Sequence, residues 1–427
     1  MWWFASEQPG LPLHTTQLGA PEGMPFYYSS PIHGWLAWPL IPLFGVAGTW
    51  NVLVVLARIA TPLCAFFAGR AWGLERTGAL VAAAVYGCSP FFHGFAVEGI
   101  VEGLDGWTLP LFLWAHFRGR RLLAVLAFAL VVVSSWYLGA VVCLLALCLG
   151  RRAWPSALVG LLLASPLVWA FGMAFPESAA VPAEVRAMMG TSVLPGVPGI
   201  LADNPFAKTS WIGLTAPVLA LVVVRERRLV AGLLAVFWVL SLGLGPDLPG
   251  LSSLRFPYRL HAGVLVLLAG LAGLGAQRWS WGAWLAPLIV VEGLLLSPIE
   301  PLIPGAPAEM HPIYDELPDG DMLLDIPGPL AMPPGQINPS RPRARWFLYQ
   351  QVFHGRASPW IPDFNGVGVA ADDGLDAVRA LDPHGPDSDD DLRIDAELVV
   401  VHGLDLELPG FVEVDEVDGK RLLQRIR

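Results

Sequence analysis

The sequence predicts a mainly α-helical, polytopic transmembrane bundle with a small C-terminal α/β domain. Of its 427 residues, 55% are hydrophobic and 15% are charged, whereas a soluble domain carries about 25% charged residues. The charges are also divided unevenly. Residues 298–427 hold 24 of the 36 acidic groups and 10 of the 26 basic ones, a net charge of −14, while residues 1–297 carry +4. An acidic chain of this kind argues against a nucleic-acid partner, because neutralising phosphates requires a basic surface.

Composition and charge together predict three domains. They are an extracytoplasmic loop over 1–46, a transmembrane domain over 47–297 and an acidic soluble domain over 298–427. The loop is rich in Pro, Gly and aromatic residues, so we expect it to lie along the membrane surface, with 33–44 as a short interfacial helix. His14 and His33 in this loop are interpreted as structural rather than catalytic.

Apolar runs predict about ten membrane spans, although several are shorter than the roughly 20 residues that a bilayer requires. Their predicted bounds are 47–70, 77–92, 107–117, 121–133, 137–149, 153–171, 210–224, 229–244, 259–276 and 281–297. The region 121–149 has two interpretations. It forms one long helix, or a hairpin that turns at Ser134–Tyr137.

The loop charges favour the hairpin, since positive loops prefer the cytoplasm. With ten spans, one set of loops carries eleven arginines against Glu75 and Glu226 only, and the opposite set is mainly acidic. A single helix over 121–149 would move Arg151 and Arg152 to the acidic side. Ten spans place both chain ends outside the cytoplasm, so we expect the C-terminal domain to be extracytoplasmic and a further helix to precede Met1.

Few charges or reactive groups lie within the predicted spans. Arg58 and Glu292 are the intramembrane charges, and such groups usually face a cavity or a partner. All four cysteines lie in apolar runs, which indicates small buried side chains rather than a disulfide framework or a zinc site. No metal site is evident from the sequence, and a divalent metal is an open possibility.

The segment 93–107, HGFAVEGIVEGLDGW, is the first candidate site on the acidic side. It begins with His93 and holds Glu98, Glu102 and Asp105 within eight residues. Glu98 and Glu102 are four residues apart, so a helical turn would place them on one face. Carboxylates this close suit a general base or a metal pair. The alternative is a solvated loop that keeps its charges in water.

The segment 252–263, SSLRFPYRLHAG, is the second candidate site. Pro257 fits the first turn of the helix that follows, and Arg255 and Arg259 flank that helix start. Free backbone N–H groups, the helix dipole and two guanidinium groups together favour an anion, with a lipid phosphate as the natural ligand. The alternative is that both arginines extend to lipid headgroups.

The acidic domain alternates turn and strand patterns. We expect a strand within 316–328, a helix over 343–355, a strand over 397–403 and a hairpin that turns at Asp418-Gly419. The acidic run 382–391 lacks the ligand spacing of a calcium loop, so we interpret it as a solvated loop.

Four stretches, in this order, resemble bacterial polytopic glycosyltransferases of the GT-C type, which use polyprenyl-phosphate-linked sugars. They are WWFASEQPGLPLHTTQLGAPEGM; SPFFHGFAVEGIVEG with WTLPLFLW; LRFPYR; and LPDGDMLLDIPG with RWFLYQQVFHGR. The resemblance implies a protein of the bacterial cytoplasmic membrane that binds membrane lipid and a polyprenyl-phosphate-linked sugar. It also implies sugar transfer with inversion of configuration at the anomeric carbon.

In such enzymes a catalytic carboxylate follows the first transmembrane helix, a position that would precede Met1 here. Glu7 and Glu22 are the acids that remain in that loop. The carboxylates of Glu98, Glu102 and Asp105 resemble the second outer acidic site of such enzymes and are the catalytic candidates, with Arg255, Arg259 and His93 at the lipid phosphate. A second hypothesis is a non-catalytic member that binds glycolipid or assists glycan assembly or export. A transporter is disfavoured, since intramembrane charges are few and no inverted repeat is visible.

Overall fold

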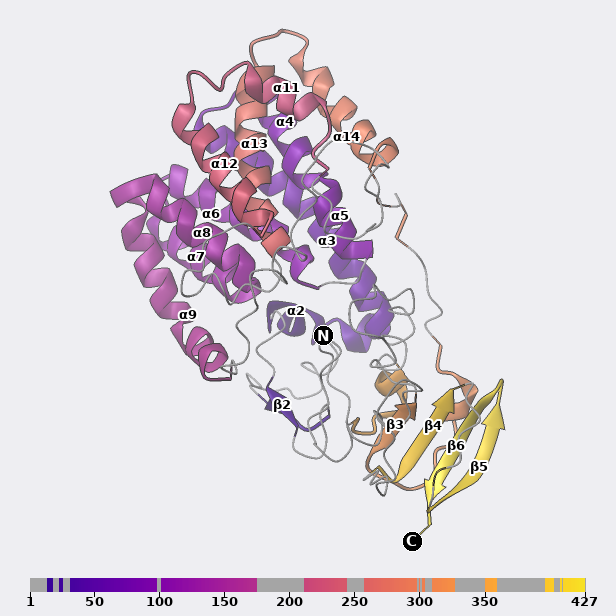
Figure 1. The fold of residues 1–427 in the computed structure, drawn as a ribbon. Coiled ribbons are helices and arrows are strands. Elements are labelled where there is room, and N and C mark those ends of the chain that lie inside the picture. The colour runs from indigo at the N-terminus through magenta and orange to yellow at the C-terminus, as the bar shows by residue number, and fades with distance from the viewer. Residues whose placement is uncertain are drawn as a thin grey trace. The chain divides into compact units, whose positions relative to one another are not determined.

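The computed structural model describes residues 14–17, 23–25, 31–97, 101–174, 211–243, 257–297, 299, 302–303, 309–326, 350–358, 396–402, 408 and 410–426 (Figure 1). The chain forms two compact units. The helical unit is Tyr27–Gly305, and the strand-containing unit combines Met1–Phe26 with Ala306–Arg427. The three predicted domains, with boundaries after residues 46 and 297, stay predictions.

The helical unit contains a helix within each of the ten predicted segments. Its α-helices are α2 (Pro31–Ala37), α3 (Ile41–Trp72), α4 (Arg76–Gly87), α5 (Pro90–Val97), α6 (Thr108–Phe117), α7 (Arg121–Ser134), α8 (Trp136–Leu149), α9 (Trp154–Ala174), α11 (Thr215–Leu221), α12 (Arg228–Ser241), α13 (His261–Ala276) and α14 (Leu285–Leu295). Short 3₁₀ helices join some of them: η1 (Val101–Trp107), η2 (Gly150–Arg152), η4 (Pro257–Leu260) and η5 (Gly282–Trp284).

The region 121–149 is two helices, as the loop charges predicted. Ser135 has extended backbone angles of φ −158° and ψ 127°, which end α7, and its hydroxyl accepts the N–H of Leu138 at the start of α8. Helices α7 and α8 pack against each other. A serine that caps the second helix therefore produces the break.

The predicted interfacial helix over 33–44 is wrong in its bounds. Helix α2 ends at Ala37, a turn follows, and α3 begins at Ile41. Gly45 kinks α3 near its start, with φ 66° and ψ 178°. Glycine alone adopts such angles without strain, so the kink separates the first turn of α3 from the helix predicted to begin at residue 47.

Three stretches of the described residues are long and apolar enough to cross a membrane: Ile41–Trp72, Arg76–Val97 and Pro257–Ala276. Four shorter apolar helices accompany them, at Arg121–Ser134, Trp154–Ala170, Arg228–Ser241 and Gly282–Leu295. Several of these helices carry large apolar side chains on their outer faces. Leu122, Leu162 and Leu229 are 74%, 71% and 91% exposed. A lipid environment suits such faces, because exposing them to water would forfeit the hydrophobic stabilisation of burial.

Small residues set the spacing of the central helices. A Cβ on Gly78 of α4 would lie 2.6 Å from the backbone oxygen of Gly273 in α13, and a Cβ on Gly87 would lie 2.3 Å from Cα of Pro62 in α3. Close backbone approach through glycine is typical of helix pairs in membranes, where dispersion replaces the hydrophobic effect. Helix α4 is consequently held between α3 and α13.

The arginine-rich loops are drawn together at one end of the helical unit, which we call the arginine end. Trp72 and Phe117, at the ends of α3 and α6, stack at 6.5 Å. The side-chain oxygen of Gln277, after α13, accepts the N–H of Glu75 before α4. Arg278 pairs with Glu226, beyond α11. Loops that the charge pattern assigned to one side of a membrane thus meet in space.

The carboxylate of Glu292 binds the N-terminus of helix α11. Its carboxylate, on α14, accepts the N–H groups of Leu214 and Thr215 at 3.3 and 3.2 Å and the Thr215 hydroxyl at 2.7 Å. These are the first donors of α11, which otherwise lack partners. A carboxylate at a helix N-terminus is also favoured by the helix dipole, so this charge within an apolar helix has a structural partner.

The strand-containing unit holds the predicted mixed sheet. Its strands are β3 (Leu323–Ile326), β4 (Leu398–His402), β5 (Phe411–Val417) and β6 (Lys420–Arg425), in the order β3-β4-β6-β5 (Figure 1). Strands β3 and β4 are parallel, and the other pairs are antiparallel. The turn between β5 and β6 has positive φ at Asp418 and Gly419, 52° and 72°, which confirms the predicted hairpin.

Two further parts of this unit come from distant sequence. Two short strands, β1 (His14–Thr15) and β2 (Met24–Pro25), pair antiparallel. The carbonyl of Gln17 accepts the Gln351 side chain at 2.6 Å and the N–H of Ser358 at 2.9 Å. Of the predicted helix 343–355, only residues from 350 on are described, and these are helical to 354. The acidic run 382–391 lies outside the described residues.

Candidate functional site

The 3₁₀ helix η1 positions the carboxylate of Asp105. Its glycines allow close packing, because a Cβ on Gly103 would overlap Phe95 and one on Gly106 would lie 2.7 Å from the ring of Phe92. The Tyr86 hydroxyl donates to the carbonyl of Gly106 at 2.8 Å. Asp105 is fully buried, so the solvated-loop interpretation of this segment does not hold for Asp105.

His33 of α2 faces Asp105. Its Nε2 lies 3.4 Å from Oδ1 of the carboxylate, and both side chains are almost inaccessible to water. Burial lowers the pKa of His33 to about 3, so the imidazole is neutral at neutral pH. The pair places an imidazole beside a carboxyl group in a part of the helical unit that is closed to water. The sequence interpretation treated His33 as structural and did not anticipate this pairing.

Arg259 lies in η4, directly before α13, and is 6% exposed. Its guanidinium carbon lies 4.8 Å from the ring centre of Tyr137 and 5.8 Å from those of Phe95 and Tyr258. Cation–π contacts of this kind hold a guanidinium in place. The alternative, an arginine that extends to lipid headgroups, does not hold for Arg259.

Phe95 joins the two groups. Its ring lies against the Arg259 guanidinium on one hand and packs on Gly103 of η1 on the other. Residues from three separate parts of the sequence therefore meet around α5: α2 and η1 supply the His33–Asp105 pair, and η4 supplies Arg259. They converge on the predicted acidic side, away from the arginine end.

The remaining predicted site residues are less completely described. His93 lies on α5 and is half-buried. Glu102 belongs to the backbone of η1, three residues before Asp105, which is one turn of a 3₁₀ helix. Glu98 and Arg255 lie outside the described residues.

His261, the first residue of α13, was not singled out from the sequence. It is fully buried, and neither ring nitrogen has a hydrogen-bond partner among the described residues. The ring lies between Phe91, at 5.5 Å, and Trp238, at 6.2 Å. A histidine two residues after Arg259 was the available signal, but its burial depends on α5 and α12.

Metal ligands do not gather within the described part of the chain. No group of three or more His, Cys, Asp or Glu side chains there is arranged to hold an ion. Cys64, Cys88, Cys143 and Cys148 are all free thiols.

A buried polar cluster lies in the strand-containing unit. The Tyr314 hydroxyl donates to Oδ1 of Asp325 on β3 at 2.6 Å, and the His354 ring stacks on Tyr314 at 5.3 Å. Nδ1 of His354 accepts the N–H of Arg356 at 3.1 Å. Each of the three side chains contacts another residue of this unit. We therefore interpret the cluster as structural, since it packs beside strand β3.

Comparison with family models, with curated proteins and with solved structures gives no match for this chain. The fold and the site therefore define a class only in structural terms. This is a mainly helical protein with three stretches long and apolar enough to cross a membrane and a small mixed sheet. Its helical unit holds a buried Asp–His pair and an arginine that lies against aromatic rings.

Proposed function

We propose that this protein is a GT-C-like membrane glycosyltransferase with about ten spans, which transfers a sugar from a polyprenyl-phosphate donor to an extracytoplasmic acceptor. The supporting observation is that Phe95 contacts both the Arg259 guanidinium and η1, the 3₁₀ helix that carries Asp105, although Asp105 and Arg259 are more than 150 residues apart in the sequence. A fixed base and a fixed cation are the two groups that transfer from a phosphate-linked sugar needs.

In this proposal Asp105 takes the proton of the acceptor hydroxyl. The acceptor oxygen bonds to the anomeric carbon as the bond from that carbon to the phosphate oxygen breaks, and the configuration inverts. Polyprenyl phosphate leaves with the electron pair, and Arg259 neutralises its growing charge. His33 is a positioning residue, which holds the carboxylate. Burial strengthens both effects, since charges interact more strongly where water is excluded.

Glu98, Glu102, Arg255 and His93 complete the proposed site through the family resemblance. The two glutamates are further candidates for the base, and Arg255 and His93 for the phosphate. The proposed location is the bacterial cytoplasmic membrane, with the strand-containing unit outside the cytoplasm.

The test uses membranes that contain the full chain and a panel of polyprenyl-phosphate-linked hexoses and pentoses, and it measures release of polyprenyl phosphate. Asp105→Asn and Arg259→Gln should each lower the release rate by about 100-fold or more. Arg278→Gln, at the arginine end, is the matched control and should leave the rate unchanged. Full activity in both site variants would refute the proposed roles.

The burial of both charged groups favours a second candidate, a protein that binds glycolipid without chemistry. Asp105 is 0% and Arg259 6% exposed, which suits binding groups that are closed off from an acceptor. The same panel separates the candidates. A binder would retain polyprenyl phosphate in an Arg259-dependent manner and release nothing from any donor.

A further inference from the structure

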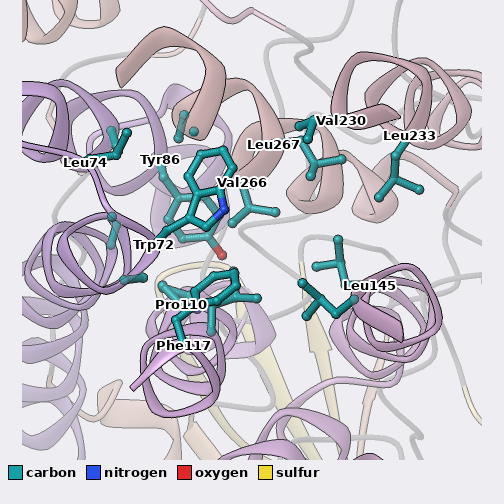
Figure 2. A pocket seen from close by; sticks show the side chains of 18 of the residues that line it. Trp72, Leu74, Tyr86, Pro110, Phe117, Leu145, Val230, Leu233, Val266 and Leu267 are labelled. Carbon is teal, nitrogen blue, oxygen red and sulfur yellow. The ribbon is translucent and has the colours of Figure 1, made fainter. Parts of the chain in front are cut away.

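A separate apolar cavity of about 200 Å³ lies within the helical unit. Helices α3, α4, α6, α8, α12 and α13 line it, and Figure 2 shows side chains of all six arranged around one space. The lining is aliphatic or aromatic, and its side-chain polar groups are the Trp72 indole N–H, the Cys148 thiol and the Tyr86 hydroxyl, which donates to the carbonyl of Gly106. The cavity therefore suits a hydrocarbon chain rather than a polar ligand.

One end of the cavity lies at the arginine end. Trp72, Phe117, Leu149 and Leu229 line it and are the terminal residues, or neighbours of the terminal residues, of α3, α6, α8 and α12. Tyr86 and Pro110 lie further along the helices, toward the opposite end. The cavity thus runs from the arginine end toward the middle of the bundle.

The rim is strongly basic. Arg118 and Arg228 directly adjoin the lining residues Phe117 and Leu229, and Arg151 follows Leu149 by two positions. All three arginines are exposed, and none has an ion-pair partner among the described residues. Of the two glutamates at this end, Glu226 is paired with Arg278. Positive charge around an apolar cavity calls for a ligand with an anionic head and an apolar tail.

We propose that this cavity binds an anionic phospholipid of the adjoining leaflet, with one acyl chain between the six helices and the phosphate on Arg118, Arg151 and Arg228. Charge complementarity selects this occupant: basic pockets between transmembrane helices on the positively charged side bind anionic headgroups. The site is independent of the transfer site proposed at Asp105 and Arg259.

The test titrates the detergent-solubilised full chain with dioleoylphosphatidylglycerol and dioleoylphosphatidylcholine, and counts bound lipid by native mass spectrometry. Phosphatidylglycerol should bind more tightly to the wild type. Arg118→Gln with Arg228→Gln should weaken phosphatidylglycerol binding by about 25-fold, at about fivefold per arginine, and leave phosphatidylcholine unchanged. The control pair, Arg121→Gln with Arg225→Gln, removes two exposed arginines at the same end that lie four positions from the nearest lining residue.

A second experiment tests binding of the acyl chain by filling the cavity with a larger side chain. Ala68 of α3 is a buried lining residue, so Ala68→Phe should reduce binding of both lipids. Leu63→Phe, on the same helix at a half-exposed position, should not. Glycerol 3-phosphate, the head without chains, should not compete. Equal binding of the two lipids by wild type overturns the proposal, as does a folded Ala68→Phe variant with unchanged binding or full competition by glycerol 3-phosphate. The arginine variants decide the matter if Ala68→Phe does not fold.

Discussion

Buried polar side chains in the strand-containing unit depend on a few short contacts. Tyr314 donates to Asp325 and stacks on His354, and Asp325 is 4% exposed. A buried polar group that loses its partner costs about 1–3 kcal/mol. This cluster therefore couples the 3₁₀ turn at Pro312–Tyr314, strand β3 and the helical residues before His354.

His354 should make the stability of this unit depend on pH. Burial lowers the pKa of His354 from 6.5 to about 4; nearby Asp325 opposes this shift, and Arg356 adds to it. The unfolded chain therefore takes up the proton first as the pH falls. The stabilisation from neutral His354 is complete above pH 6.5 and is lost as the pH drops toward 4, by at most about 1.4 kcal/mol per pH unit.

Thermal unfolding of the full chain between pH 7 and pH 4 measures this effect. His354→Gln should flatten the fall in melting temperature below pH 6.5. His14→Gln, at an exposed position, should leave it unchanged. An identical slope in the wild type and His354→Gln would contradict this account.

Single residues were the least predictable level. The sequence indicated Asp105 because three carboxylates lie within eight residues, and Arg259 because it lies beside the start of a helix on the acidic side. It did not indicate the partners, because His33 lies 72 positions before Asp105 and Tyr137 lies 122 before Arg259. Contacts over such separations depend on how the helices pack, which local patterns do not encode.

At the scale of elements, Glu292 joins α14 to the start of α11. Glu292→Gln should destabilise the helical unit by about 1–3 kcal/mol, because a charge-assisted interaction with three donors is weakened. Glu226→Gln is the control, since its pair with Arg278 is largely exposed and is worth about 0–1 kcal/mol. Thermal unfolding in detergent measures both. Equal effects of the two substitutions would show that Glu292 does not secure α11.

Glycine contacts should limit substitution between α4 and α13. Gly78→Ala would place a methyl group 2.6 Å from the Gly273 oxygen, and such overpacking costs about 1–3 kcal/mol. Gly232→Ala on α12 meets open space and should be neutral or slightly stabilising. Melting temperatures of the two variants should therefore move in different directions. A stable Gly78→Ala variant would mean that the helices separate without cost.

Element boundaries were predictable where local chemistry decides them. Asp418-Gly419 turns the last hairpin, as its residue types predicted, whereas the break that Ser135 caps was predicted from the charges of the flanking loops. The start of α3 was not predictable, because Gly45 kinks a helix that continues through it. A glycine within an apolar run indicates either a helix end or a bend, and only the packed structure distinguishes them.

At the scale of the whole molecule, the proposed orientation predicts which surfaces reagents reach. In a chain with its four cysteines replaced by serine, Glu416→Cys on β5 should react with a membrane-impermeant maleimide added to intact cells. Arg151→Cys should react only after the cells are permeabilised. Both positions are exposed, so accessibility to the reagent decides the outcome. The reverse pattern would invert the proposed topology.

The contact between α4 and α13 also has a consequence for biosynthesis. Glu75 and Gln277, which join these helices at the arginine end, are 202 residues apart. At a synthesis rate of about 5–20 residues per second, α4 waits about 10–40 s for its partner to emerge. Throughout that interval the glycine-lined face of α4 lacks α13, its partner in the folded protein. The newly made protein is thus most vulnerable to wrong helix pairing before its last third has been translated.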